Sequence, residues 1–210
     1  MPQELTALAG ILAALTVGVM SPGPSFVMVA RTAVAASRSQ ARGAAAGMGV
    51  GGLLFGTAAL LGLRGVFHAV PSLYLALKVL GGMYLCYLGL MIFKSARQPL
   101  PVHVVEPGGT EAKRSFLLGL ATQVSNPKTA IVYASVFAAF LPQDFSLGFA
   151  AVLLALVLAV ETGWYSLVAL VLSSAAPQKA YLSCKVWVDR AAGLVMCGLG
   201  LRLVTSAARL

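Results

Sequence analysis

Charged residues are scarce in this chain: only 10% of its 210 positions are Asp, Glu, Lys or Arg. Soluble domains carry about 25% charged residues, because polar side chains must cover the surface that faces water. Hydrophobic residues fill 59% of the positions, which excludes a disordered protein, since disorder requires low hydrophobicity and high charge. The remaining class is an integral membrane protein whose outer surface faces lipid. At this length we expect transmembrane helices and no sizeable domain outside the membrane.

Acidic residues are the scarcer of the two charged kinds, with six Asp and Glu against fifteen Lys and Arg and a net charge of +9. In a soluble protein this excess of basic residues would suggest a nucleic-acid partner. No basic run is interleaved with aromatic residues here, so we expect no nucleic-acid partner. Basic cytoplasmic loops of a membrane protein explain the excess more simply.

Cysteine is also rare. Cys86, Cys184 and Cys197 have neither a Cys-x-x-Cys motif nor the spacing of metal ligands. All three lie in apolar stretches and are interpreted as small buried hydrophobic residues. We therefore expect no metal site and no cofactor.

Long uncharged runs dominate the rest of the sequence. When the runs that a single charge interrupts are merged, they predict an all-α fold of six helices, each long enough to cross a bilayer. The helices are expected at 7–34, 43–64, 71–93, 115–141, 146–173 and 187–207. Pro71 precedes the third helix, Pro142 follows the fourth, and Pro177 is expected between the fifth and the sixth.

The longest polar segment, 94–115, contains three prolines and two glycines. We interpret it as a cytoplasmic linker between a first three-helix repeat at 1–93 and a second at 116–210. The basic residues expected in cytoplasmic loops are Arg38, Arg42, Lys94, Arg97, Lys113, Arg114, Lys179 and Lys185. With these loops on the cytoplasmic side, both termini are periplasmic. Three helices per half would give the halves opposite orientations, an inverted repeat that is typical of many secondary transporters.

A proline motif interrupts the first and the fourth expected helices, Ser-Pro-Gly-Pro in the first and Ser-Asn-Pro-Lys in the fourth. Pro22 and Pro127 are 105 residues apart, half the chain length. Proline breaks a helix interior but is favoured at the first position of a new helix, after a Ser or Asn cap. We therefore expect both helices to be broken, with new half-helices that begin at these prolines and are capped by Ser21 and Asn126.

Each new half-helix would begin inside the membrane, with unpaired N–H groups and a partial positive charge at its start. Irregular backbone at this depth is tolerated only where it is buried in protein or lines a wet cavity. A single proline is more often a simple kink. Two capped prolines at matching places in two halves instead favour the binding site of a transporter.

These motifs resemble those of the lysine exporter (LysE/RhtB) superfamily of bacterial amino-acid exporters. The resemblance rests on Ser-Pro-Gly-Pro with a glycine-rich second helix, on Ser-Asn-Pro-Lys-Thr-Ala after the central loop, and on Asp189-Arg190 with Gly193, Gly198 and Gly200 in the last helix. It implies a multi-pass carrier of the bacterial inner membrane, not an enzyme, that exports amino acids or related small zwitterionic metabolites. It also implies that the proton gradient drives export, and two inverted halves are expected to work by alternating access.

Two charged side chains fall at depth, Lys128 in the break of the fourth helix and Glu161 near the centre of the fifth. A charge at the bilayer centre costs about 2.5–3.5 kcal/mol and usually faces a cavity or a partner. For an amino-acid substrate, the half-helix N-termini and Lys128 suit the carboxylate, and Glu161 suits the ammonium group or a competing proton. The predicted substrate-binding residues, of which Glu161 also couples protons, are Ser21, Pro22, Gly23, Pro24, Gln123, Ser125, Asn126, Pro127, Lys128 and Glu161.

Simpler interpretations exist for several of these residues. Lys128 and Glu161 could form a structural ion pair that only holds the fourth and fifth helices together. Gln123, Ser125 and Asn126 could bond to carbonyl groups of an irregular helix instead of a ligand.

Two further groups also have two interpretations. Trp164 and Tyr165 are interpreted mainly as lipid-interface anchors, although they follow Glu161 closely enough to line a pocket. Gly43 and Gly47, with Gly51 one turn later, form a small-residue face that favours close helix packing, more within one subunit than in a homodimer. The expected partners are therefore the substrate, protons and lipid, with a homodimer as an open alternative.

Two other functions fit part of the pattern. A membrane thiol–disulfide carrier would need a cysteine pair in matching helices of the two halves, but the residue 105 positions after Cys86 is Ala191. A passive channel would also accommodate broken helices, but a carboxylate and a lysine at mid-membrane favour a gated binding site.

Overall fold

The computed structural model describes residues 2–21, 23–35, 38–69, 71–97, 112–173 and 175–207, and these residues form helices and no strand. The helices are α1 (Pro2–Met20), α2 (Pro24–Ala35), α3 (Arg38–Ala69), α4 (Pro71–Ser95), α5 (Ala112–Val124), α6 (Pro127–Phe140), α7 (Leu147–Leu172) and α8 (Ala175–Ala207). The predicted all-α class is therefore confirmed for the described part of the chain. Most of the expected linker 94–115 lies outside the described residues.

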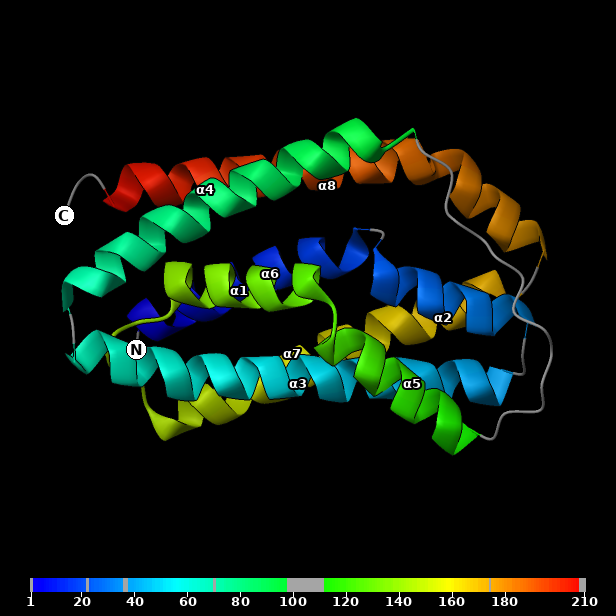
Figure 1. Ribbon diagram of the computed structural model, residues 1–210, viewed down its shortest axis with the longest axis horizontal. Coiled ribbons are helices and arrows are strands. Elements are labelled where there is room, and N and C mark those ends of the chain that lie inside the picture. Colours follow the sequence, from blue (N-terminus) through cyan, green and yellow to red (C-terminus); the bar gives the residue numbers. More distant parts are fainter. Residues whose placement is uncertain are drawn as a thin grey trace.

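The helices run back and forth along one long axis (Figure 1). α1 and α2 together make one traverse, as do α5 and α6, whereas α3, α4, α7 and α8 each span most of the length by themselves. α4 packs along α8 at one side, and α3 packs against α5 and α7. The start of α1 and the end of α8 lie at the same end of the molecule, as an even number of traverses requires.

The described helices are apolar enough for a membrane. Three of them have segments long and apolar enough to cross it, namely Gln3–Met20, Arg38–Leu63 and Leu147–Leu172, and shorter apolar helices lie at Gly82–Lys94 and Pro127–Phe140. Large hydrophobic side chains are exposed on the outside of several helices, among them Leu54, Leu61, Leu80, Met83, Leu90, Leu117, Leu167, Leu170 and Leu194. A surface of this kind is stable in lipid and would be costly in water. The chain is thus a membrane protein.

The last helix begins earlier than the sequence predicted. α8 starts at Ala175, not at 187, and Pro177 lies in its first turn instead of between two helices. Proline is tolerated there, because the first N–H groups of a helix have no intrahelical acceptor. The start at 187 was predicted from an uncharged run. Such a run indicates the part of a helix that faces lipid, but the helix can begin before it.

Both predicted breaks are present. α1 ends at Met20 and α2 begins at Pro24, while α5 ends just before the second motif and α6 begins at Pro127. Asn126 caps α6, because its side-chain oxygen accepts a 3.0 Å hydrogen bond from the Lys128 backbone N–H.

The predicted cap of the other half-helix is wrong. The Ser21 backbone N–H donates to the Val17 carbonyl at 3.2 Å, so Ser21 continues the end of α1 instead of opening α2. α2 begins at Pro24, two residues later than expected. Pro22 lies outside the described residues.

The glycine face of α3 is used inside the chain. Cβ atoms added at Gly43 and Gly47 would collide with backbone oxygens of α5, and one added at Gly119 of α5 would collide with the Ala44 carbonyl of α3. Only glycine allows two helices to approach so closely. This confirms the interpretation as internal packing. It also presses the end of α5 against α3, where Gly51 faces the Gln123 side chain.

The crossing of α4 and α8 is close to two-fold symmetric. The Cys86 thiol donates to the Cys197 carbonyl at 3.5 Å, and the Cys197 thiol donates to the Cys86 carbonyl at 3.4 Å. Cys86 and Cys197 therefore lie opposite each other, although they are not 105 residues apart. Residues 105 positions apart are equivalent in the two expected repeats, but equivalent residues need not be in contact. Where two helices cross antiparallel, a residue further along one helix lies opposite a residue further back on the other. Both thiols are free, and neither lines the hollow described below.

Candidate functional site

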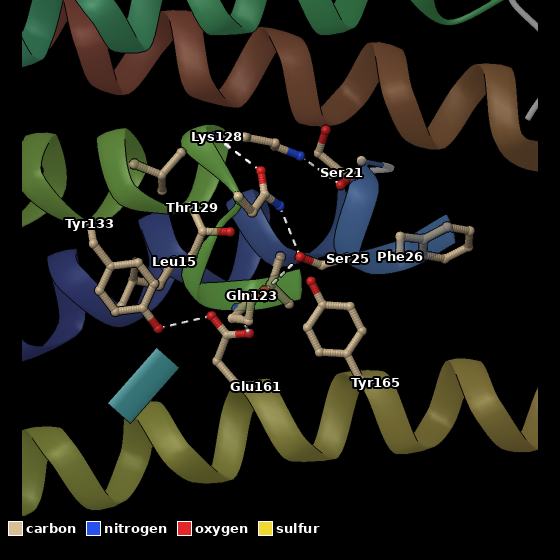
Figure 2. A pocket seen from close by; sticks show the side chains of 15 residues that line it. Leu15, Ser21, Ser25, Phe26, Gln123, Lys128, Thr129, Tyr133, Glu161 and Tyr165 are labelled. Atoms are coloured by element: carbon tan, nitrogen blue, oxygen red, sulfur yellow. Dashed lines mark hydrogen bonds between the residues drawn. The ribbon is translucent and has the colours of Figure 1, made fainter. Parts of the chain in front are cut away.

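The two helix breaks meet at a hollow between α1, α2, α5, α6 and α7 (Figure 2). It holds about 350 Å³ of unfilled space, part of it open to the outside. Its lining comes from both halves of the chain and consists of Leu15, Gly18, Val19, Ser21, Gly23, Ser25, Phe26, Gln123, Asn126, Lys128, Thr129, Val132, Tyr133, Glu161 and Tyr165.

A chain of hydrogen bonds runs from the start of α6 to the middle of α7 (Figure 2). The Asn126 side chain accepts from the Lys128 N–H and donates through Nδ2 to the Ser25 hydroxyl at 2.8 Å. Ser25 Oγ donates to Gln123 Oε1 at 2.6 Å, and Gln123 Nε2 donates to Glu161 Oε2 at 3.0 Å. Each link donates toward the carboxylate, so both breaks and α7 are joined by one polarised network.

Glu161 is the acceptor at the end of this network. It is 2% exposed, and its second oxygen, Oε1, accepts a 2.8 Å hydrogen bond from the Tyr133 hydroxyl. A carboxyl whose two oxygens both accept is in the arrangement of its ionised form. Gly52 of α3 lies directly against the pair, because an added Cβ would be 2.8 Å from both Glu161 Cγ and Tyr133 Oη.

Lys128 does not pair with Glu161. Its Nζ donates to the Ser21 carbonyl at 2.7 Å, and Glu161 is bonded to Gln123 and Tyr133 instead. The interpretation of the two charges as a structural ion pair is therefore wrong. The ammonium group lies where α1 ends, and a cation is favoured at the C-terminal end of a helix dipole. Gly23 leaves room for it, since an added Cβ would be 3.2 Å from Lys128 Cδ.

The Ser21 side chain has an unused polar atom. Ser21 is 2% exposed, and its hydroxyl has no hydrogen-bond partner among the described residues. A buried polar atom without a partner is costly. Because this hydroxyl lines the hollow, a polar ligand there could satisfy it.

Six of the ten predicted site residues line the hollow, namely Ser21, Gly23, Gln123, Asn126, Lys128 and Glu161. Pro24, Ser125 and Pro127 are exposed side chains outside the lining, although the two prolines begin the half-helices. Pro22 is not among the described residues. The role of all ten in binding stays a prediction.

Several lining residues were not predicted as site residues. Ser25 directly follows Pro24, so its hydroxyl lies in the first turn of α2. Tyr133 lies seven residues after Asn126, and seven residues make two helical turns, so both side chains are on one face. Helical spacing from the predicted caps would therefore have identified Tyr133.

Tyr165 was predicted mainly as a lipid-interface anchor, with the pocket as the alternative. It is 4% exposed and lines the hollow one turn after Glu161, so the pocket interpretation is confirmed. Trp164 is partly buried and lies outside the lining.

Proteins with similar sequences cover between 59% and 90% of the chain. The threonine efflux protein of Escherichia coli (strain K12) is 33% identical over 192 residues, 90% of this chain and 93% of that protein. A membrane protein of Haemophilus influenzae of uncharacterised function is 30% identical over 191 residues, 89% of this chain and 90% of the relative. The leucine efflux protein of Enterobacter sp. (strain 638) is 29% identical over 126 residues, 59% of this chain and 58% of that protein.

No solved structure is significantly similar to the chain. The family model of the LysE type translocators matches residues 16–207. This range includes both proline motifs, the residues of the hollow except Leu15, and the whole of α8. The chain belongs to the LysE type translocator family, and it is a membrane transport protein rather than an enzyme.

Proposed function

We propose that the protein exports a small zwitterionic amino acid across the bacterial inner membrane, in exchange for protons and by alternating access. The names of its relatives, threonine and leucine efflux proteins, support the substrate class. The observation that carries the proposal is the buried Glu161 carboxylate in the lining of the hollow, which is linked to both helix breaks through Gln123 and Ser25.

The proposed topology is six membrane spans in two inverted repeats, residues 1–93 and 116–210, joined by a cytoplasmic linker at 94–115. The back-and-forth course of the helices supports it, as does the position of both described ends at one end of the molecule (Figure 1). The reciprocal contact between Cys86 and Cys197 supports a two-fold axis between the halves. Under the positive-inside rule the termini are periplasmic.

The substrate carboxylate is proposed to bind at the starts of α2 and α6, beside Lys128. The first N–H groups of a helix lack intrahelical acceptors and carry a partial positive charge. The Ser21 hydroxyl, which has no partner among the described residues, lies at the same end of the hollow. Together these groups match an anion, and helix N-termini are frequent anion sites.

The ammonium group of the substrate is proposed to bind Glu161. The carboxylate end of this site lies on α7, across the hollow from Lys128 and the Ser21 hydroxyl (Figure 2). Apolar side chains, Leu15, Val19 and Val132, complete its lining. A site with one end for an anion and one end for a cation suits the two charged groups of a zwitterionic amino acid.

Proton coupling is proposed to act through the hydrogen-bond chain. Protonation of Glu161 turns one of its two acceptor oxygens into a donor, so either Gln123 or Tyr133 loses its acceptor. If Gln123 turns its oxygen toward Glu161, its NH₂ group faces Ser25 and the direction of the chain reverses. The reversal would reach Asn126, the cap of α6, and so change the second break. Protonation and ammonium binding at Glu161 exclude each other, as an antiporter requires.

Counterflow in proteoliposomes tests this function. The purified protein is reconstituted, and uptake of labelled amino acids from a panel that includes threonine and leucine is measured with and without an imposed proton gradient. We expect saturable exchange that the gradient accelerates. Glu161→Gln is expected to abolish the acceleration. Undiminished proton-driven export in this variant would contradict the role of Glu161, and absence of exchange for every amino acid would contradict the substrate class.

A passive channel is the competing function. Electrical recordings from planar bilayers separate the two, because a channel passes ions far faster than a carrier turns over. Currents well above carrier turnover would contradict alternating access.

A further inference from the structure

A second buried carboxylate lies outside the hollow, on α8. Asp189 and Lys185 are 3% and 7% exposed, and they form an ion pair one helical turn apart, with 2.7 Å between Nζ and Oδ2. Lys185 also donates to the Ala96 carbonyl at 3.1 Å, just after α4. The pair is electrically neutral and links α8 to the end of α4.

This pair leaves one atom without a partner. Asp189 Oδ1 is buried and has no hydrogen-bond donor among the described residues. An ionised carboxylate oxygen in the interior of a membrane protein normally has one, because leaving it bare is costly. A purely structural role for the pair would not need this second oxygen to stay bare.

Lys128 lies on the side of the hollow that α8 covers (Figure 2). The Lys128 ammonium group is held at the end of α1 by the Ser21 carbonyl, and α1 packs against α8. Met196, on the same face of α8 two turns after Asp189, packs against α1, since a Cβ added at Gly18 would lie 3.1 Å from its methyl group. Ser21 lies on the same side of the hollow as the Lys128 side chain (Figure 2).

The Lys128 ammonium group can donate more hydrogen bonds than the one it makes to the Ser21 carbonyl. An ammonium group carries three N–H donors, and in this structure the Ser21 carbonyl is its hydrogen-bond acceptor. A carboxylate oxygen on α8 and an ammonium group at the end of α1 therefore lie at two helices that pack against each other, and the two groups are not bonded in this structure.

We propose that Asp189 is a positioning residue that acts through Lys128. During transport Lys128 Nζ moves from the Ser21 carbonyl to Asp189 Oδ1, and Lys185 keeps Asp189 ionised while this happens. In the structure described here, Lys128 ties the start of α6 to the end of α1 and so holds the two breaks together. Once Lys128 is bonded to Asp189, the breaks can separate and the hollow can open. This inference rests on the proposed transport function.

The variants separate this role from simple packing. Asp189→Asn removes the charge but leaves Lys185 buried without its counter-ion, which by itself destabilises a protein. The double variant Asp189→Asn/Lys185→Gln removes both charges and keeps side chains that can hydrogen bond to each other. Asp189→Glu restores a carboxylate, and Asp144→Asn in the exposed loop before α7 is the matched control.

Exchange kinetics give the first measurement. We expect the neutral double variant to lower the maximal exchange rate about tenfold and to change KM less than threefold, because Asp189 does not touch the substrate. Asp189→Glu should recover at least half of the rate, and Asp144→Asn should match the unchanged protein. In the Lys128→Gln background, loss of Asp189 should have no further effect, since the two residues act as one unit. Independent, multiplying effects would overturn the proposal.

Thiol labelling gives a second measurement that needs no transport. Thr129→Cys is placed in a background in which Cys86, Cys184 and Cys197 are replaced by serine, and its labelling by a membrane-impermeant maleimide is followed from both sides of vesicles. We expect the neutral double variant to slow this labelling about fivefold, because the hollow stays closed. Unchanged labelling, or faster labelling with a lower Tm, would show that the pair only packs α8 and would overturn the proposal. If the protein transports no amino acid but the labelling shift occurs, the proposed function fails while the exchange of partners by Lys128 stands.

Discussion

Gln123 and Glu161 are joined by a 3.0 Å hydrogen bond from Nε2 to Oε2, although they are 38 residues apart in the sequence. Gln123 lies at the end of α5, immediately before the second helix break, and Glu161 lies in the middle of α7. The position of the break and the charge of the carboxylate are therefore coupled directly. If Glu161 Oε2 stops accepting, the Gln123 side chain beside the break must change its hydrogen bonds.

Replacement of Gln123 tests this coupling. Gln123→Leu keeps a similar volume, but it removes a donor to Glu161 and the acceptor of the Ser25 hydroxyl. Each buried group left without a partner costs about 1–3 kcal/mol. We expect amino-acid exchange to fall at least tenfold in counterflow assays and the Tm of the purified protein to fall. Gln143→Leu, in an exposed loop, is the control and should change neither value. Full exchange in Gln123→Leu would show that the hydrogen-bond chain is not used in transport.

Gly52→Ala tests how tightly α3 packs on the site. The new methyl group would lie 2.8 Å from Glu161 Cγ and 2.8 Å from Tyr133 Oη, so the two side chains must separate. Overpacking of this kind costs about 1–3 kcal/mol. We expect exchange to fall about tenfold while the protein still inserts and purifies as a monodisperse species.

The matched control for this variant is Gly62→Ala on the same helix. An added Cβ there meets nothing within 4 Å, and alanine is the better helix former by about 1 kcal/mol. Its exchange rate should be unchanged and its Tm equal or slightly higher. Equal losses in the two variants would mean that α3 tolerates no substitution and that the contact of Gly52 with the site is not special.

Tyr133→Phe removes a single hydroxyl group. The ring of Tyr133 stacks on that of Phe137 with centroids 5.9 Å apart and can stay in place, so the variant isolates the 2.8 Å hydrogen bond to Glu161 Oε1. We expect a rate of proton-driven export at least fivefold lower, with little change in Tm. Tyr87→Phe, whose side chain is 56% exposed on α4, is the control. An unaltered export rate in Tyr133→Phe would restrict the functional network to the Gln123 side of the carboxylate.

The sequence predicts the positions of the breaks well because proline acts locally. A proline cannot continue a helix, and the residue before it is either a good cap or not. Asn126 and Pro127 follow this rule. The first motif has two prolines, and α2 begins at the second, Pro24. Local rules do not decide between the two.

The hydrogen-bond partners of Glu161 could not be predicted in the same way. That the carboxyl faces a cavity follows from the cost of a charge in lipid, but its partners depend on which faces of α5, α6 and α7 meet. Those faces are determined by close backbone contacts such as that of Gly47 with Phe116, and a single sequence does not show which glycine meets which helix. Lys128 was therefore one candidate partner of Glu161, whereas the structure has Gln123 and Tyr133 in that place.

The cap of α6 allows stability and function to be separated. Asn126→Ala removes the acceptor of the Lys128 N–H and the donor to Ser25, and loss of a cap costs about 0.5–2 kcal/mol. Ser146→Ala removes a comparable cap from α7, where Ser146 Oγ accepts from the Phe149 N–H at 3.1 Å. Ser146 is not part of the lining of the hollow. We expect similar decreases of a few degrees in Tm for both variants.

Exchange should distinguish the two caps. In Asn126→Ala it should fall at least tenfold, because the hydrogen-bond chain loses the link between α6 and α2. In Ser146→Ala it should stay within twofold of the unchanged protein. Asn126→Ser restores an oxygen cap without the amide donor, so it should recover the Tm but not the exchange rate. If exchange followed Tm across all three variants, Asn126 would act only as a helix cap, and the polarised chain that ends at Glu161 would have no part in moving the proton.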